Sequence, residues 1–244
     1  MRLKSSFVMY LISFCVIIHD SFECCKRNDI SFGLFAEICY NGQKGGAPME
    51  ILYTDNHIVV CVKPVGLDSE ADVPRALCEV VGGSFFPVHR LDKNVGGVMV
   101  YARTKAAAAA LSKAIQDGTM IKEYVAQVHG LPPESGDWVD LLFKDSSKNK
   151  VFVVKKERKG VKKARLEFLR LTQSDPALVR IRLHTGRSHQ IRVQFASRGY
   201  PLLGDHKYGA RDEFTAPKLF SCKLTFPLFG KVYAFEALPD WAAM

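Results

Sequence analysis

The sequence predicts an α+β domain built on a mixed, largely antiparallel sheet with helices packed against it. Segments of alternating or β-branched apolar residues outnumber segments with helical periodicity. Many of these strand-like segments follow one another after short polar turns, which is typical of hairpins. Hydrophobic residues make up 48% of the 244 residues and charged residues 24%, the composition of a folded chain with a substantial core.

The first predicted elements are a hairpin and a strand. Residues 51–53 and 58–64 form the two arms of the hairpin, with Asp55 and Asn56 at its turn. Asn and Asp favour such a position because their side chains can hydrogen-bond to nearby backbone groups. Residues 97–102 are rich in β-branched side chains, and they predict the next strand.

An alanine-rich segment predicts the longest helix. Thr104 provides a side-chain oxygen that can accept a hydrogen bond from the first turn, and the helix then runs to Asp117. Gly118 ends it, because glycine readily adopts the left-handed conformation that follows many helices. Residues 121–129 alternate between faces in the manner of a strand.

The second half of the chain is again dominated by strands. Residues 145–171 predict two strands joined by a very basic loop, and residues 177–183 predict another strand. A short helix is expected from about residue 188 to residue 197, after a turn that contains glycine. Residues 219–226 and 231–237 predict the last two strands, and no internal repeat is present.

The charge balance favours a polyanionic partner. Lys and Arg number 34 against 25 Asp and Glu, and residues 1–48 account for only five of the basic and four of the acidic residues.

Cysteines within the predicted domain lack a Cys-x-x-Cys pair, which indicates reduced thiols in a cytoplasmic protein. His184 and His189 are five residues apart, a poor spacing for metal ligands on one helix face, so we expect no metal site.

Residues 1–48 are expected to lie outside the domain, which would then span residues 49–244. Lys44-Gly45-Gly46 can be encoded by a purine-rich ribosome-binding sequence, and Met49 follows at a spacing that suits initiation. We therefore interpret residues 1–48 as sequence upstream of a misassigned start. A secretory signal is the alternative, because basic residues precede a short apolar run that is not long enough to span a membrane.

Two short motifs carry the strongest functional signal. Residues 89–92 have the sequence His-Arg-Leu-Asp, and residues 185–192 have the sequence Thr-Gly-Arg-Ser-His-Gln-Ile-Arg. At these motifs the chain resembles the RluA family of RNA pseudouridine synthases, in its short form without an N-terminal S4 domain. The resemblance extends to residues 122–126, 201–209 and 235–239, and so covers roughly residues 50–240.

This resemblance implies a long curved sheet with a central catalytic cleft and an enzyme that isomerises uridine to pseudouridine in structured rRNA or tRNA. It implies no cofactor and no metal, and we expect a monomer that acts away from membranes. Asp92 matches the family's catalytic aspartate, which bonds either to C1′ of the ribose or to C6 of the uracil. Arg192 matches its ion-pair partner, and Tyr124 matches the active-site tyrosine, whose ring can stack on an extruded base.

A second group of residues is predicted to contact RNA. By resemblance, the arginine of the first motif enters the base stack that the target nucleotide leaves, while other polar residues of both motifs and the basic loop suit phosphate contacts. A structural role for the histidine of the first motif and a solvated loop are the alternatives. The predicted RNA contacts are His89, Arg90, Arg187, His189, Gln190, Lys155, Lys156, Lys159, Lys162 and Lys163.

The sequence departs from the family pattern next to the predicted nucleophile. The family has Thr-Ser-Gly three residues after its aspartate, whereas this chain has Val95-Gly96-Gly97 and therefore lacks two hydroxyl groups. If these hydroxyls only shape the loop, glycine can replace them. If they hold the aspartate or the RNA, the chain is instead a catalytically silent RNA-binding protein that retains the fold.

Overall fold

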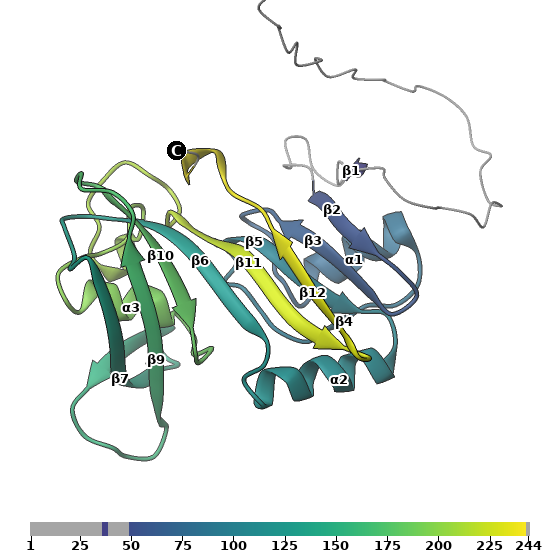
Figure 1. Cartoon of the computed structure of the whole chain (residues 1–244). Helices are drawn as coiled ribbons and strands as arrows, with labels where there is room; N and C mark the ends of the chain where they lie inside the picture. The colour runs from purple at the N-terminus through teal and green to yellow at the C-terminus, as the bar shows by residue number, and fades with distance from the viewer. Residues whose placement is uncertain (1–35, 39–48, 243–244) are drawn as a thin grey trace, which may run out of the picture. The chain divides into compact units, whose positions relative to one another are not determined.

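The computed structural model describes residues 36–38 and 49–242, and every strand that it contains belongs to one mixed sheet (Figure 1). The strands lie in the order β1-β2-β3-β5-β11-β6-β10-β9-β7-β8, with β12 added to β11 and β4 added to β5. All pairs are antiparallel except β5 with β11. The strands are β1 Ala36–Ile38, β2 Met49–Thr54, β3 Ile58–Lys63, β4 Phe86–Pro87, β5 Gly96–Ala102, β6 Ile121–Val128, β7 Ser135–Asp145, β8 Lys150–Val154, β9 Val161–Arg170, β10 Ala177–Leu183, β11 Leu219–Leu228 and β12 Lys231–Glu236.

Strand β11 joins two parts of the sheet that are otherwise separate. It pairs in parallel with β5 on one side and antiparallel with β6 on the other. The parallel contact is close: a Cβ atom at Gly97 would lie 2.4 Å from the backbone nitrogen and oxygen of Ser221. Gly97 also has a φ of +127°, so only glycine fits this point of the strand.

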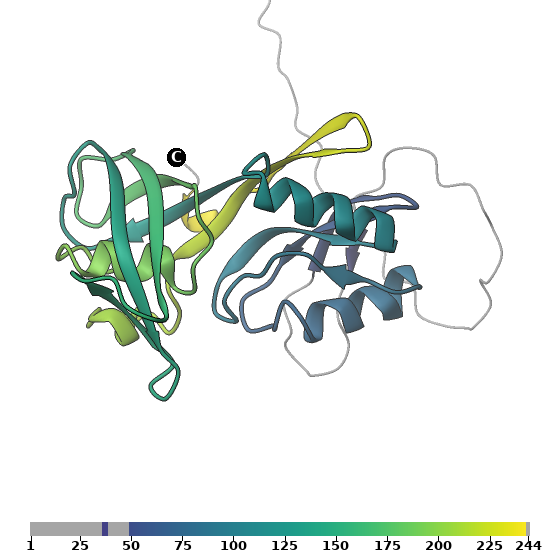
Figure 2. The same ribbon diagram turned by 90° about the horizontal axis from the view of Figure 1, so that it is seen from below.

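Two helices cover opposite faces of β3 and β5, as Figure 2 shows. Helix α1 (Asp72–Val81) packs Leu77 against the face that carries Cys61 and Met99. Helix α2 (Lys105–Gln116) packs Leu111 against the face that carries Val60. Because both faces are covered, all seven residues of β5 are buried, and this strand forms a rigid support for the loop that precedes it.

A third helix, α3 (Gln190–Ala196), packs on β7 and β9 through an aromatic cluster. The rings of Trp138, Phe168 and Phe195 lie with centroids 4.4 to 5.3 Å apart at tilted or edge-on angles. The helix has only seven residues, but all but its last residue are buried. This packing fixes the orientation of the polar side chains that α3 directs away from the core.

Most of the predicted elements are confirmed, including the first hairpin, the alanine-rich helix and the last two strands. Thr104 accepts a hydrogen bond from the backbone of Ala107, and Asp55 accepts two from its own turn, so both local signals act as expected. The short helix begins at Gln190 rather than near residue 188, because His189 has a left-handed backbone with a φ of +49°.

The two strands predicted on either side of the basic loop are present as β8 and β9, but they do not pair with each other. Strands β8 and β9 follow one another in the chain, but both pair with β7, a strand that the sequence analysis did not predict. Helix α1 was also missed, since Pro74 suggests an interruption although it lies in the first turn, where its absent N–H costs nothing.

The predicted leader falls mostly outside the described residues. Within it the structure describes only residues 36–38, and these pair antiparallel with β2. Residues 1–35 and 39–48 are not described. Among the described helices, none is long and apolar enough to cross a membrane.

Candidate active site

A cleft of about 650 Å³ brings the two sequence motifs together. The loop before β5 forms one wall, and residues 182–192 form the opposite wall, with the start of β6 between them. The predicted catalytic residues Asp92, Tyr124 and Arg192 all line this cleft. So do five of the predicted RNA contacts, namely His89, Arg90, Arg187, His189 and Gln190.

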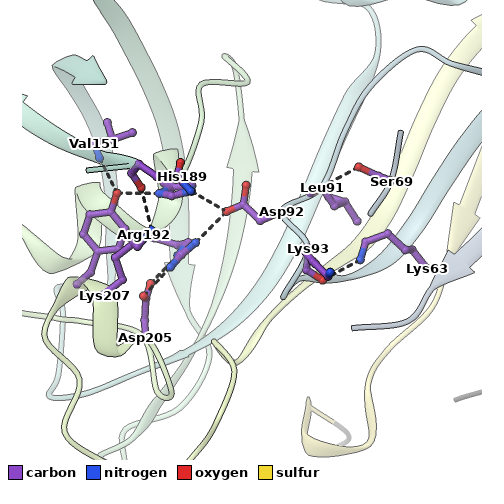
Figure 3. A network of polar contacts seen from close by, with 12 residues as sticks. Lys63, Ser69, Leu91, Asp92, Lys93, Val151, His189, Arg192, Asp205 and Lys207 are labelled. Atoms are coloured by element: carbon purple, nitrogen blue, oxygen red, sulfur yellow. Dashed lines mark hydrogen bonds and ion pairs between the residues drawn. The ribbon is translucent and has the colours of Figure 1, made fainter. Parts of the chain in front are cut away.

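Asp92 lies on a loop whose backbone is held on both sides. The Ser69 hydroxyl donates to the carbonyl of Leu91 at 3.0 Å, and the ammonium of Lys63 donates to the carbonyl of Lys93 at 3.2 Å (Figure 3). The backbone N–H of Val95 closes the turn by donating to the carbonyl of Asp92 at 2.9 Å. These bonds fix the direction of the carboxylate, which is 25% exposed and reaches the cleft.

Arg192 is buried and bridges two carboxylates, as Figure 3 shows. Its Nη1 donates to Asp92 at 3.0 Å, while Nε and Nη2 each donate to Asp205 at 2.7 Å. Asp205 is 1% exposed, so the bidentate pair anchors the guanidinium firmly. The arginine then presents its Nη1 to Asp92, and this hydrogen bond orients that carboxylate.

His189 adds a second contact to Asp92. Its Nε2 lies 3.8 Å from the Asp92 carboxylate, and its Nδ1 lies 2.9 Å from the hydroxyl of Tyr208. That hydroxyl also accepts a hydrogen bond from the backbone of Val151, and the Tyr208 ring lies beneath the guanidinium of Arg192. Burial lowers the pKa of His189, so the ring is neutral and holds Tyr208 rather than adding charge to the cleft.

Tyr124 lies on β6, where it belongs to the core cluster and also lines the cleft. It is 6% exposed, and burial, assisted by the negative charge of Asp92, raises the pKa of its hydroxyl. The phenol therefore stays protonated at neutral pH. A protonated, buried tyrosine can donate a hydrogen bond and offer a flat face to a base, but it does not act as a phenolate.

His89 takes a structural position. Its Nε2 accepts a hydrogen bond from the backbone N–H of Val100 at 3.2 Å. Burial, with a smaller effect from the nearby positive charge of Lys122, lowers the pKa of His89 to about 3. The ring is thus neutral at physiological pH, which favours the alternative that it orients the loop rather than binding phosphate.

The low pKa of His89 predicts acid sensitivity. Below pH 6.5 the unfolded chain binds a proton that the folded chain rejects, so stability falls as the pH drops from 6.5 towards 3. His89→Gln keeps an acceptor but cannot titrate, and the variant should lose about 2 kcal/mol less stability than wild type between pH 7 and pH 4.5. Urea unfolding at the two pH values measures this difference, and equal losses would contradict it.

The other predicted RNA contacts of the motifs differ in exposure. Arg90 is exposed at the rim and pairs with Glu70 at 2.6 Å. Arg187 is also exposed, and its Nε donates to the carbonyl of Lys163 at 3.0 Å. Gln190 is buried, and its amide bonds to the backbone of Arg165 and Arg187, so it shapes the turn that forms this part of the cleft wall.

The basic loop and the first residues of β9 together form a basic segment, which borders the cleft without lining it. Its lysines are all exposed, and they occupy the loop after β8 and the first residues of β9. The contact between Arg187 and the carbonyl of Lys163 places the start of β9 next to the cleft wall. The five lysines predicted to bind RNA, none of which lines the cleft, are Lys155, Lys156, Lys159, Lys162 and Lys163.

The sequence analysis missed three residues that hold the site. Asp205 anchors Arg192, Tyr208 supports His189, and Lys63 is fully buried, where its ammonium donates to three backbone carbonyls. Burial lowers the pKa of Lys63 to about 8. Lys63 ends an apolar strand, and a lysine at such a position is a sequence signal for a buried structural role.

Within the part of the chain that the structure describes, no group of three or more His, Cys, Asp or Glu side chains is arranged to hold a metal ion. Carboxylates are also scarce in the cleft: Asp92 is the single acidic residue among those that line it. The basic residues of the lining are Arg90, Lys122, Arg182, Arg187 and Arg192. The cleft therefore offers one carboxylate to a ligand that is otherwise attracted by positive charge.

Comparisons with known proteins agree on one family. A family model described as RNA pseudouridylate synthase matches residues 57–197. An uncharacterized RNA pseudouridine synthase of Aquifex aeolicus is 34% identical over 190 residues, which cover 71% of this chain and 60% of that protein. The dual-specificity RNA pseudouridine synthase RluA of Escherichia coli is 34% identical over 207 residues, which cover 78% of this chain and 93% of that protein.

Solved structures support the same fold. The human RNA pseudouridylate synthase domain containing 1 superposes with a TM-score of 0.69 at 22% identity, covering 79% of this chain and 83% of that chain. The human RNA pseudouridylate synthase domain containing 4 superposes with a TM-score of 0.66 at 24% identity, covering 78% and 89%. At these identities the likeness concerns the fold, which is the predicted pseudouridine synthase fold.

Proposed function

The chain belongs to the RluA-type family of RNA pseudouridine synthases, isomerases that convert uridine to pseudouridine in RNA, and we propose that it modifies specific uridines in structured rRNA or tRNA with Asp92 as the nucleophile. The observation that carries this proposal is the chain of contacts from Asp205 through Arg192 to Asp92. It orients the single carboxylate of the cleft among basic residues, as nucleophilic attack on an RNA nucleotide requires.

The reaction would begin when the target nucleotide leaves its base stack and enters the cleft. Tyr124 then stacks on the base, and Asp92 bonds to C1′ of the ribose or to C6 of the uracil. The bond between N1 and C1′ breaks, the base turns, and C5 is joined to C1′ with loss of the C5 proton. No other reactant is needed, because the product is an isomer of the substrate.

Arg90 is suited to fill the gap that the target base leaves in the RNA. Its side chain is 63% exposed, and the exposed ion pair with Glu70 is the interaction that it would have to give up. Such surface pairs contribute only about 0 to 1 kcal/mol. Releasing Glu70 therefore costs little compared with the few kcal/mol that extrusion of a stacked base requires.

The departure at Val95-Gly96 favours catalysis more than silent binding. Val95 is 2% exposed in the core, and its backbone holds the turn that presents Asp92. A Cβ atom at Gly96 would lie 3.1 Å from the carbonyl of Lys63, so glycine suits this tight position. The loop is thus fixed by backbone bonds without the two missing hydroxyl groups, which supports an active enzyme over the alternative of a silent RNA-binding protein.

Comparative mapping of pseudouridine tests the proposal. Total rRNA and tRNA from cells with and without the gene should differ at one or a few uridines, and purified protein should restore these positions in RNA from the deletion strain without added metal or cofactor. RNA that is bound but never modified would favour the silent-binding alternative. The free thiols at Cys61, Cys78 and Cys222 support a cytoplasmic location, and we expect a monomer.

Replacing the five lysines of the basic segment, Lys155, Lys156, Lys159, Lys162 and Lys163, by serine should weaken RNA binding and flatten its dependence on salt. Each lost phosphate contact lowers the slope of log affinity against log salt by roughly 0.7 to 0.9. The rate on saturating RNA should change far less, since none of these residues lines the cleft. Binding titrations at several salt concentrations measure the slope, and an unchanged slope would show that the segment faces away from RNA.

A further inference from the structure

Lys122 is a cation of the cleft to which the functions above assign no task. It lies on β6 two residues before Tyr124, and alternate residues of a strand share one face, so both side chains point to the cleft side of the sheet. A Cβ atom at Gly186 would lie 3.4 Å from the Lys122 ammonium, which places that ammonium against the opposite wall. Lys122 thus lies between the proposed stacking residue and the turn of the second motif.

The ammonium of Lys122 has no carboxylate partner among the described residues. Arg192, the other sheltered cation of the cleft, is neutralised by Asp92 and Asp205. Arg90 and Arg187 are exposed at the rim. Burial lowers the pKa of Lys122, and no neighbouring acid offsets this effect. A partly buried positive charge without a partner costs free energy in the unliganded protein, which suggests that its partner arrives with the substrate.

The depth of Lys122 in the cleft indicates which part of the RNA it meets. Phosphates lie on the outside of a nucleic acid and are reached by the exposed arginines of the rim, whereas an extruded base enters furthest. An ammonium has three donors and no acceptor. Uracil offers two carbonyl oxygens as acceptors, while cytosine carries a donor amino group at the position of one of them.

We propose that Lys122 donates a hydrogen bond to a carbonyl oxygen of the target uracil and stabilises the negative charge that this base acquires during the reaction. The proposal rests on the function proposed above. It adds a catalytic residue and a reason for selecting uracil over cytosine. Lys122 keeps its proton throughout, so its contribution is electrostatic.

The charge develops on the base in either version of the mechanism. If Asp92 bonds to C1′, the bond between N1 and C1′ breaks, its electron pair goes to the base, and the charge spreads over N1 and the carbonyl oxygens. If Asp92 adds to C6, the electron pair of the C5–C6 bond moves towards O4. When C5 is joined to C1′, the bond to Asp92 breaks and the carboxylate recovers its electron pair. The C5 proton then passes to solvent, and N1 takes up a proton from solvent. Lys122 can act on the anionic base in both cases.

Single-turnover kinetics test the proposal with excess protein and rRNA or tRNA from a deletion strain. Lys122→Met should lower the rate at saturation by about 100-fold, the effect of losing one preorganised donor to developing charge. The dissociation constant for RNA should change by less than about threefold, because the phosphate contacts remain. Lys122→Arg keeps the charge and should recover part of the rate. Lys113→Met, at an exposed lysine outside the cleft lining, is the matched control and should match wild type.

Other outcomes separate the possible failures. A weaker affinity with an unchanged saturating rate would assign Lys122 to phosphate and overturn the proposal. If wild-type protein forms no pseudouridine, the proposed function fails and this inference fails with it. Should Lys122→Met not fold, as judged by thermal melting, Lys122→Gln provides a second test, since it keeps a polar side chain at this position of the cleft but removes the positive charge. That variant should lower the saturating rate, and a wild-type rate would overturn the proposal.

Discussion

Asp92→Asn is expected to lower the rate of pseudouridine formation by at least about 10³-fold, because an amide does not supply the nucleophilic oxygen that the reaction needs. The fold should persist, since Arg192 keeps its two bonds to Asp205. Affinity for RNA should stay within about threefold, because the phosphate contacts lie elsewhere. Quantification of pseudouridine after nuclease digestion measures the rate, and titration with labelled RNA measures the affinity.

Asp117→Asn is the matched control for this variant. Asp117 is an exposed aspartate at the end of α2, paired with Lys113 and outside the cleft lining. The same chemical change there should leave the rate and the affinity at wild-type values. Pseudouridine formation by Asp92→Asn at the control's rate would remove Asp92 from the proposed mechanism.

Arg192→Met is expected to cost about 3 to 5 kcal/mol of folding free energy, because it leaves the buried carboxylate of Asp205 without its counter-charge and removes the partner of the half-buried Asp92. Activity should also be lost, since Asp92 then lacks the hydrogen bond that orients its carboxylate in the cleft. Urea unfolding at pH 7 measures the change in stability, and the pseudouridine assay measures activity at a temperature where the variant is folded.

Arg165→Met tests whether burial is the cause. Arg165 also bridges two carboxylates, those of Asp137 and Glu167, but all three side chains are 40 to 50% exposed. Exposed ion pairs contribute about 0 to 1 kcal/mol, so this variant should remain close to wild type in stability. Similar losses of folding free energy in the two variants would show that the buried bridge of Arg192 stabilises the fold no more than an exposed one.

Local signals explain how much of the fold the sequence could predict. Thr104 at a helix start and Asp55 at a turn act through neighbours within a few residues, and both predictions are confirmed. Helix α1 was missed because Pro74 is tolerated only at its particular place in the first turn. Strand β7 was missed because it carries polar residues on its exposed face, and only its pairing with both β8 and β9 identifies it as a strand.

The site was predicted through motifs, and its supporting residues were not. The pair of Asp92 and Arg192, 100 residues apart, could be expected only by resemblance to a family. Asp205 lies near a glycine in a loop, where an exposed aspartate is common, and nothing local reveals that it is buried beneath Arg192. Gln190 matched the motif as an RNA contact, yet its amide is used to hold the turn. Long-range burial, which short sequence patterns do not encode, decides these roles.

The central position of β11 has a consequence for synthesis of the protein. While the ribosome is still translating residues before Leu219, the sheet consists of two fragments whose inner strands, β5 and β6, have unpaired edges. Only the late strand can close this gap and bring the loop of Asp92 into place opposite Arg192. A nascent chain would therefore be open to aggregation or chaperone capture until β11 emerges, and it would gain the ability to act on RNA only after that.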